Sequence, residues 1–250
     1  MSDRHAAVWA AARPYLTARK NDVHIPLSYA CAERLLEHHP EADDEVVLLA
    51  ILLHDLGWAV VDQEAIYRDS FGPGGMESAV RLAHEKQGAR LAREILGGLD
   101  YPEPLVEEVA TIIDGHDTRR EALSRNDELV KDSDRLWRFS LTGVSVICDW
   151  MQTTPAGWAA RLLDQLDGFF TPEGRRFAEE DLERTRAVLK IDLIAPVPPP
   201  SPRIGSTSDV IYRPRTLLDS PENQRAQLLI RDLRTGSHKD RAPLRLCAPA

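Results

Sequence analysis

The sequence has few cysteines, no long apolar run and no excess of basic residues. Its three cysteines lie far apart and are odd in number, so they form neither a disulfide framework nor a paired-cysteine zinc site. No stretch of about 18 apolar residues is present, so we expect no membrane-spanning segment. The N-terminal residues lack the apolar core of a secretory signal, and we therefore expect a cytoplasmic protein.

The charge balance is acidic, with a formal net charge of −9. Hydrophobic residues make up 43% of the chain and charged residues 28%, a composition typical of globular proteins. A net negative surface repels nucleic-acid phosphates and anionic lipid headgroups. We therefore expect neither a nucleic-acid polymer nor a membrane as the main partner.

A change in composition near residue 190 predicts where the folded domain ends. Residues 1–190 contain 22 Lys and Arg against 34 Asp and Glu, whereas residues 191–250 contain nine against six. Nine of the 17 prolines follow residue 190, and five of these lie in 196–202. Proline fixes φ and lacks an N–H donor, so this stretch cannot join a helix. We expect a folded domain over 1–190 and a Pro-rich, largely irregular C-terminal tail over 191–250.

The apolar pattern before residue 190 is helical. Residues 46–53 are apolar on almost every side, which is typical of a central helix, and Asp43 or Asp44 can cap its start. Further helices are expected over 83–96, 103–113, 129–150 (as one or two helices) and 172–189, the last one capped by Thr171. No alternating strand pattern is present, so the fold class expected is all-α.

The dipeptide His54-Asp55 ends the most apolar of these helices. Burial of both side chains is costly unless they are paired or bind a metal. Imidazole and carboxylate together suit zinc, manganese, iron or nickel better than calcium. The alternative is a structural pair that caps a neighbouring helix, and the dipeptide alone does not decide between the two.

The other histidines and acids occur in an order that carries more information. Along the chain the order is His24, His54-Asp55, His84, His116-Asp117 and then Asp132 and Asp134. This order resembles the HD superfamily of metal-dependent phosphohydrolases over roughly residues 20–140. The resemblance implies an HD-domain helical bundle in which Asp55 bridges two ions. It implies these metal ligands: His24, His54, Asp55, His84, His116 and Asp134.

Only one of Asp132 and Asp134 can face the site, because residues two apart on a helix point about 200° apart. Asp134 fits the family position better. Four histidines and two carboxylates are more ligands than one ion needs, so we expect two divalent or iron ions, with Fe, Mn, Ni or Co as candidates. A hydroxide held between them would be the nucleophile, with Asp55 as the catalytic carboxylate. Nearby acids could orient the ligand imidazoles: Asp114, Asp117 and Glu85.

The sequence departs from the family at Trp58, where many members have a lysine three residues after the Asp of the HD pair. Trp58 could stack on the substrate or pack against the end of the helix. A small anionic substrate also needs a cation, and Arg119, Arg120 and Lys86 follow closely on proposed ligands. These four residues are the predicted substrate-binding set.

Three functions are compatible with this pattern. The first is hydrolysis of a small phosphorylated or nucleotide-like substrate through a bridging metal-bound hydroxide. The second is an HD-domain di-iron oxygenase that cleaves a C–C or C–P bond of a small polyol or phosphonate. The third is a non-catalytic HD domain that keeps its metal. Because all six ligand positions are filled, the sequence argues against a degenerate site. The ligand set does not distinguish the hydrolase from the oxygenase, but Trp58 in place of the lysine weakens the resemblance to the oxygenating members, so the hydrolase is favoured.

Overall fold

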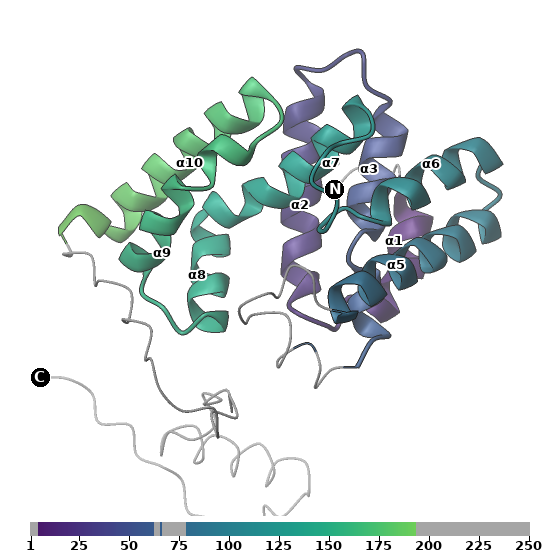
Figure 1. Cartoon of the computed structure of the whole chain (residues 1–250), viewed down its shortest axis with the longest axis horizontal. Coiled ribbons are helices and arrows are strands. Elements are labelled where there is room, and N and C mark those ends of the chain that lie inside the picture. Colours follow the sequence, from purple (N-terminus) through teal and green to yellow (C-terminus); the bar gives the residue numbers. More distant parts are fainter. Residues whose placement is uncertain (1–4, 63–65, 67–78, 194–250) are drawn as a thin grey trace, which may run out of the picture. The chain divides into compact units, whose positions relative to one another are not determined.

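The computed structural model describes residues 5–62, 66 and 79–193, and these residues form helices with no strand among them. The expected all-α fold class is confirmed. Figure 1 labels the α-helices. Their bounds are α1 Ala6–Ala12, α2 Asn21–Leu36, α3 Asp44–Leu53, α5 Ala79–Gly98, α6 Glu103–Ile113, α7 Arg125–Leu136, α8 Leu141–Trp150, α9 Pro155–Leu163 and α10 Pro172–Leu189. No helix in this part of the chain is long and apolar enough to cross a membrane.

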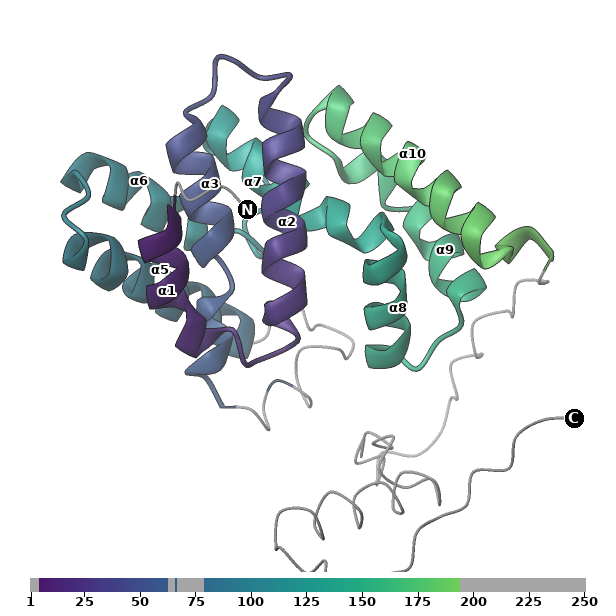
Figure 2. The same cartoon turned by 180° about the vertical axis from the view of Figure 1, so that it is seen from behind.

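Helix α3 is the central element of the bundle, as its sequence predicts. Residues 46–53 are all buried, and α2, α5, α6 and α7 pack around them (Figures 1 and 2). The Asp43 carboxylate caps the start of the helix by accepting from the N–H groups of Glu45 and Val46. The helix therefore delivers His54, its C-terminal cap, into the middle of the bundle.

Two glycines allow the turn after α3 to lie directly against α5. This turn is the short 3₁₀ helix η3, Leu56–Ala59. A Cβ atom added at Gly57 would lie 1.9 Å from the carbonyl oxygen of His84, and one added at Gly88 would lie 2.9 Å from that of His54. Only glycine fits such a backbone approach. The contact brings His84 next to the end of α3.

Helices α8, α9 and α10 form a second group, which is joined to α7 through the 3₁₀ helix η5, Trp137–Phe139. Figure 2 shows these three helices together, next to α2 and α7. The predicted helical stretch over 129–150 is two helices, because Ser140 caps α8 by accepting from the Gly143 N–H. Helix α10 begins at Pro172 with Thr171 as its cap, as predicted.

The last α-helix ends at Leu189, and Lys190 caps it in a left-handed conformation with φ of 52°. One 3₁₀ turn follows, η7 at Ile191–Leu193. The expected tail lies almost wholly outside the described residues, so its irregular character and the domain boundary near residue 190 remain predictions.

Candidate metal centre

The six predicted metal ligands converge where five helices meet. Each of α2, α5 and α7 contributes one ligand from within the helix, and the turns that follow α3 and α6 contribute the rest. The imidazoles are at most 5% exposed, and the two carboxylates are 11% and 13% exposed. The converging residues are His24, His54, Asp55, His84, His116 and Asp134.

One group within this cluster consists of His24, His54 and Asp134. The two Nε2 atoms lie 3.0 Å apart, and Asp134 Oδ1 is 3.2 Å from Nε2 of His24 and 3.4 Å from Nε2 of His54. Two donor atoms each about 2.1 Å from one ion lie roughly 3.0–3.4 Å apart in octahedral or tetrahedral coordination. The spacing of this group therefore fits a single transition-metal ion.

A second group is centred on His84 and His116, whose Nε2 atoms are 3.5 Å apart. Asp55 Oδ1 lies 3.6 Å from the His84 nitrogen and 3.4 Å from the His116 nitrogen. The other oxygen of the same carboxylate, Oδ2, lies 3.5 Å from Nε2 of His24 in the first group. Oδ2 of Asp55 thus lies toward the first group, whereas Oδ1 lies toward the second group and 3.9 Å from Nε2 of His54.

Asp117 is a possible ligand that the sequence interpretation missed. Its carboxylate forms a further metal-capable group with His84 and His116, and Oδ2 lies 3.7 Å from Nε2 of His84. The same oxygen accepts from Arg81 at 2.8 Å. The available signal was the dipeptide His116-Asp117, which repeats His54-Asp55 and, like it, closely follows the end of a helix.

Backbone carbonyls orient two of the imidazoles. His54 Nδ1 donates to the carbonyl of Ile51 at 2.7 Å, and His116 Nδ1 donates to that of Ile113 at 2.9 Å. A proton on Nδ1 leaves the Nε2 lone pair of a neutral ring free to bind a metal. The expectation that Glu85 orients a ligand ring is wrong, because its carboxylate accepts from the N–H groups of residues 117 and 118 and from the Thr118 hydroxyl.

The metal-free cluster is strongly coupled electrostatically. Burial disfavours the charged form of His116, but hydrogen bonding to Asp55 and the charge of Asp117 outweigh this and raise its pKa to about 9. Burial and the neighbouring His116 lower the pKa of His84 to about 3. Burial favours a protonated Asp55, but the charge of His54 and the hydrogen bond with His116 hold the pKa of this carboxyl well below its usual range. The raised pKa favours a protonated His116 at neutral pH, next to the carboxylates of Asp55 and Asp117.

The HD-domain family matches residues 24–138, which spans the cluster from its first histidine to just past its last aspartate. The chain contains an HD domain. Its fold is similar to the crystal structure of a predicted HD superfamily hydrolase from an uncultured Thermotogales bacterium, with a TM-score of 0.51 and 18% sequence identity. That similarity covers 76% of this chain and 91% of the other. A comparison with curated proteins found no match.

Of the two roles predicted for Trp58, the structure supports packing against the end of the helix rather than stacking on a substrate. The side chain has no exposed surface. Its ring stacks on that of His84, with centroids 3.7 Å apart and planes 12° apart, and its Nε1 donates to Asp55 Oδ1 at 2.8 Å. Trp58 therefore positions two proposed ligands.

The three other predicted substrate-binding residues, unlike Trp58, lie away from the centre. Arg119 donates to the carbonyl of Asp114 at 2.8 Å and pairs with Asp127 at 3.0 Å, so it stabilises the C-terminal end of α6. Arg120 is exposed in the loop that follows. Lys86 is exposed and lies two residues beyond His84, about 200° around α5, so it faces away from the cluster.

The choice between Asp132 and Asp134 agrees with the helical geometry. Asp134 lies in the cluster, whereas Asp132 accepts from the N–H groups of Phe170 and Thr171 and from the Thr171 hydroxyl, each within 2.9 Å. Asp132 thus anchors the start of α10 to α7. Asp134 therefore belongs to the metal centre, and Asp132 belongs to the packing of the second helical group.

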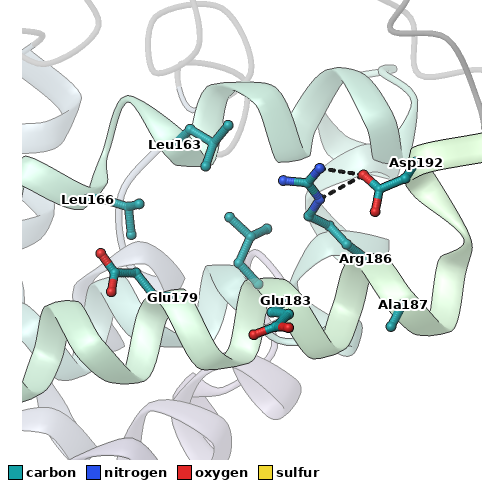
Figure 3. A pocket seen from close by; sticks show the side chains of 8 residues that line it. Leu163, Leu166, Glu179, Glu183, Arg186, Ala187 and Asp192 are labelled. Atoms are coloured by element: carbon teal, nitrogen blue, oxygen red, sulfur yellow. Dashed lines mark hydrogen bonds and ion pairs between the residues drawn. The ribbon is translucent and has the colours of Figure 1, made fainter.

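A surface pocket of about 340 Å³ lies between α9 and α10 and shares no residue with the cluster (Figure 3). Three carboxylates line it, and the guanidinium of Arg186 pairs with one of them, Asp192. Such a lining repels an anionic substrate. The metal centre, rather than this pocket, is the candidate site for chemistry on a phosphate.

Proposed function

We propose that this HD domain is a metal-dependent phosphohydrolase that acts on a small phosphorylated or nucleotide-like substrate. The observation that carries the proposal is the position of Asp55 between two groups of buried histidines, with one carboxylate oxygen toward each. The donor set of nitrogen and oxygen atoms fits two transition-metal ions. Bound divalent ions would supply an acidified water as nucleophile and would polarise a phosphate oxygen.

The residues around Asp55 hold it for this role. The Trp58 indole N–H fixes Oδ1, and the side-chain amide of Asn21 donates to the Asp55 backbone carbonyl at 3.0 Å. Both partners are buried; Trp58 holds the carboxylate and Asn21 holds the backbone of Asp55. Asp55 would be shared by the two ions and would keep them at a fixed separation, which is what a two-metal displacement at phosphorus requires.

The proposal is tested by metal analysis combined with phosphate release. Protein loaded with Mn, Co, Ni or Fe should contain about two ions per chain and release inorganic phosphate from some members of a panel of nucleotides and sugar phosphates. The variant Asp55→Asn should lose both properties. A matched control is Asp114→Asn, an exposed acid two residues before His116, which should keep both.

Anaerobic purification with electron paramagnetic resonance separates the proposal from its main competitor. A mixed-valent di-iron signal, with oxygen consumption and no metal-dependent phosphate release, would contradict the hydrolase and select the oxygenase. Stoichiometric metal with neither activity would select a non-catalytic HD domain.

A further inference from the structure

Among the described residues, the cluster reaches solvent mainly through its carboxylates. The four imidazole side chains are 0–5% exposed. The carboxylates of Asp55, Asp134 and Asp117 are 11%, 13% and 16% exposed. A substrate that reaches the centre must therefore approach from the side where these three acids lie, which we call the carboxylate edge.

Each acid of the carboxylate edge has an arginine next to it, and the three arginines come from separate parts of the chain. Arg138 donates to Asp134 Oδ2 at 2.9 Å, and Arg81 donates to Asp117 Oδ2 at 2.8 Å. The third, Arg19, interacts electrostatically with Asp55 and Asp117.

Arg19 is held in place by Trp58. Its guanidinium carbon lies 4.2 Å from the centroid of the Trp58 ring, the same ring that stacks on His84 and donates to Asp55. The backbone of Arg19 is left-handed, with φ of 49°, as is that of the next residue, Lys20, with φ of 58°. Non-glycine residues adopt this conformation at a cost, and such strain gathers at functional positions.

Arg19 lies close enough to Arg81 and Arg138 for their charges to act on it. Burial lowers the pKa of the Arg19 guanidinium, the charges of Asp55 and Asp117 raise it, and the charges of Arg81 and Arg138 lower it. The three carboxylates offset these charges, but a guanidinium has five N–H donors, which is more than one carboxylate accepts. The metals alone do not supply enough charge, because two divalent ions and three carboxylates leave one positive charge, whereas a phosphate monoester carries nearly two negative charges.

We propose that Arg19, Arg81 and Arg138 form an anion subsite on the carboxylate edge that binds the phosphate group of the substrate. The inference rests on the proposed phosphohydrolase function and names the residues that recognise its substrate. A guanidinium presents a planar fork of N–H donors, so it can contact a carboxylate and a phosphate oxygen at the same time.

Arg19 is the first residue to test, because its guanidinium lies over the Trp58 ring, which itself contacts His84 and Asp55. Inorganic phosphate would be titrated calorimetrically into the full-length protein loaded with Mn²⁺ at neutral pH. Arg19→Gln should weaken phosphate binding by about tenfold to a hundredfold, the worth of a charge-assisted hydrogen bond, at unchanged metal content. Arg19→Lys keeps the charge but loses the planar fork of donors, so its phosphate affinity should lie between those of the wild type and Arg19→Gln.

Arg138→Gln should also weaken phosphate binding, and metal content is measured in parallel because Arg138 contacts Asp134. The controls are Lys86→Gln and Arg120→Gln, which remove exposed cations outside the cluster and should leave phosphate affinity unchanged. Arg19→Gln and Arg138→Gln proteins that retain their metal and bind phosphate as the wild type does would overturn the subsite, as would a metal-loaded wild type that binds no phosphate.

This titration does not depend on turnover, so the two proposals can fail separately. If the loaded wild type binds phosphate through Arg19 but hydrolyses no phosphate ester, the subsite stands and the hydrolase proposal falls. If it hydrolyses phosphate esters and Arg19→Gln binds phosphate at wild-type affinity, the hydrolase stands and the subsite falls.

Discussion

A methyl group at Gly57 should damage both the stability of the domain and one half of the metal centre. In Gly57→Ala the new Cβ would lie 1.9 Å from the carbonyl oxygen of His84 and 2.6 Å from the amide nitrogen of Gly88. Ordinary contacts begin near 3.4 Å, so α5 and the turn after α3 must separate by more than an ångström. Overpacking of this kind costs about 1–3 kcal/mol, and at roughly 2–4 °C per kcal/mol the melting temperature should fall by about 2–12 °C.

The same displacement would move His84 away from Asp55, whose Oδ1 is 3.6 Å from the His84 nitrogen. We therefore expect Gly57→Ala to lose the ion held by the second group while keeping the ion held by His24 and His54. Thermal unfolding by circular dichroism and metal analysis of the same samples would measure both effects. Gly97→Ala, on the same helix but with open space around the new methyl group, should not lower the melting temperature. Gly57→Ala with wild-type melting and two bound ions would refute the reasoning.

Three further predictions concern the cluster itself. Asp134→Ala should abolish metal binding by the first group. Asp132→Ala should keep the metal but lower the melting temperature, because it leaves the buried Thr171 N–H without its hydrogen-bond partner. The reverse result would show that Asp132 is the ligand and Asp134 the packing residue. His116→Ala should lose one ion and keep the other, and a variant that still binds two would show that this histidine is structural. The pKa of His116 is about 9, and a coordinated imidazole must be neutral, so metal binding by the second group at neutral pH should release a proton. The metal affinity of this group should therefore rise with pH up to about 9. Mn²⁺ titrations in buffers of different ionisation enthalpy would detect the proton, and a heat of binding that is the same in every buffer would contradict the prediction.

Local signals were enough to predict several elements of the fold. The helix over 103–113 follows a proline at residue 102, and the helix over 172–189 has a threonine cap and a proline at its first position, so both were predicted with the bounds observed. The apolar run over 46–53 predicted a buried central helix for a different local reason: a helix without a polar face must be covered on all sides. The spacing of Asp132 and Asp134 predicted correctly that only one of them faces the cluster.

The errors concern residues whose surroundings are set by distant parts of the chain. Trp58 is buried because the approach of η3 to α5 places its ring on His84, and no local pattern encodes that contact. Arg119 was a plausible anion ligand by its distance along the chain, yet the carbonyls that end α6 were a nearer partner. Arg19 and Lys20 both adopt left-handed backbone conformations beside the cluster, and no local pattern indicates these conformations.

The way in which α3 and α6 end has a consequence for stability. Both helices finish at the cluster, and the rings of His54 and His116 that follow them lie with centroids 4.9 Å apart. Each helix C-terminus carries about half a negative charge from its dipole, so two like helix ends meet there beside three carboxylates. Metal ions that offset the negative charge of these helix ends and carboxylates would bind the folded chain and not the unfolded chain. Metal binding would therefore increase the free energy of unfolding. A hundredfold excess of metal over its dissociation constant would add about 2.7 kcal/mol per ion, and chelators should therefore loosen the central bundle.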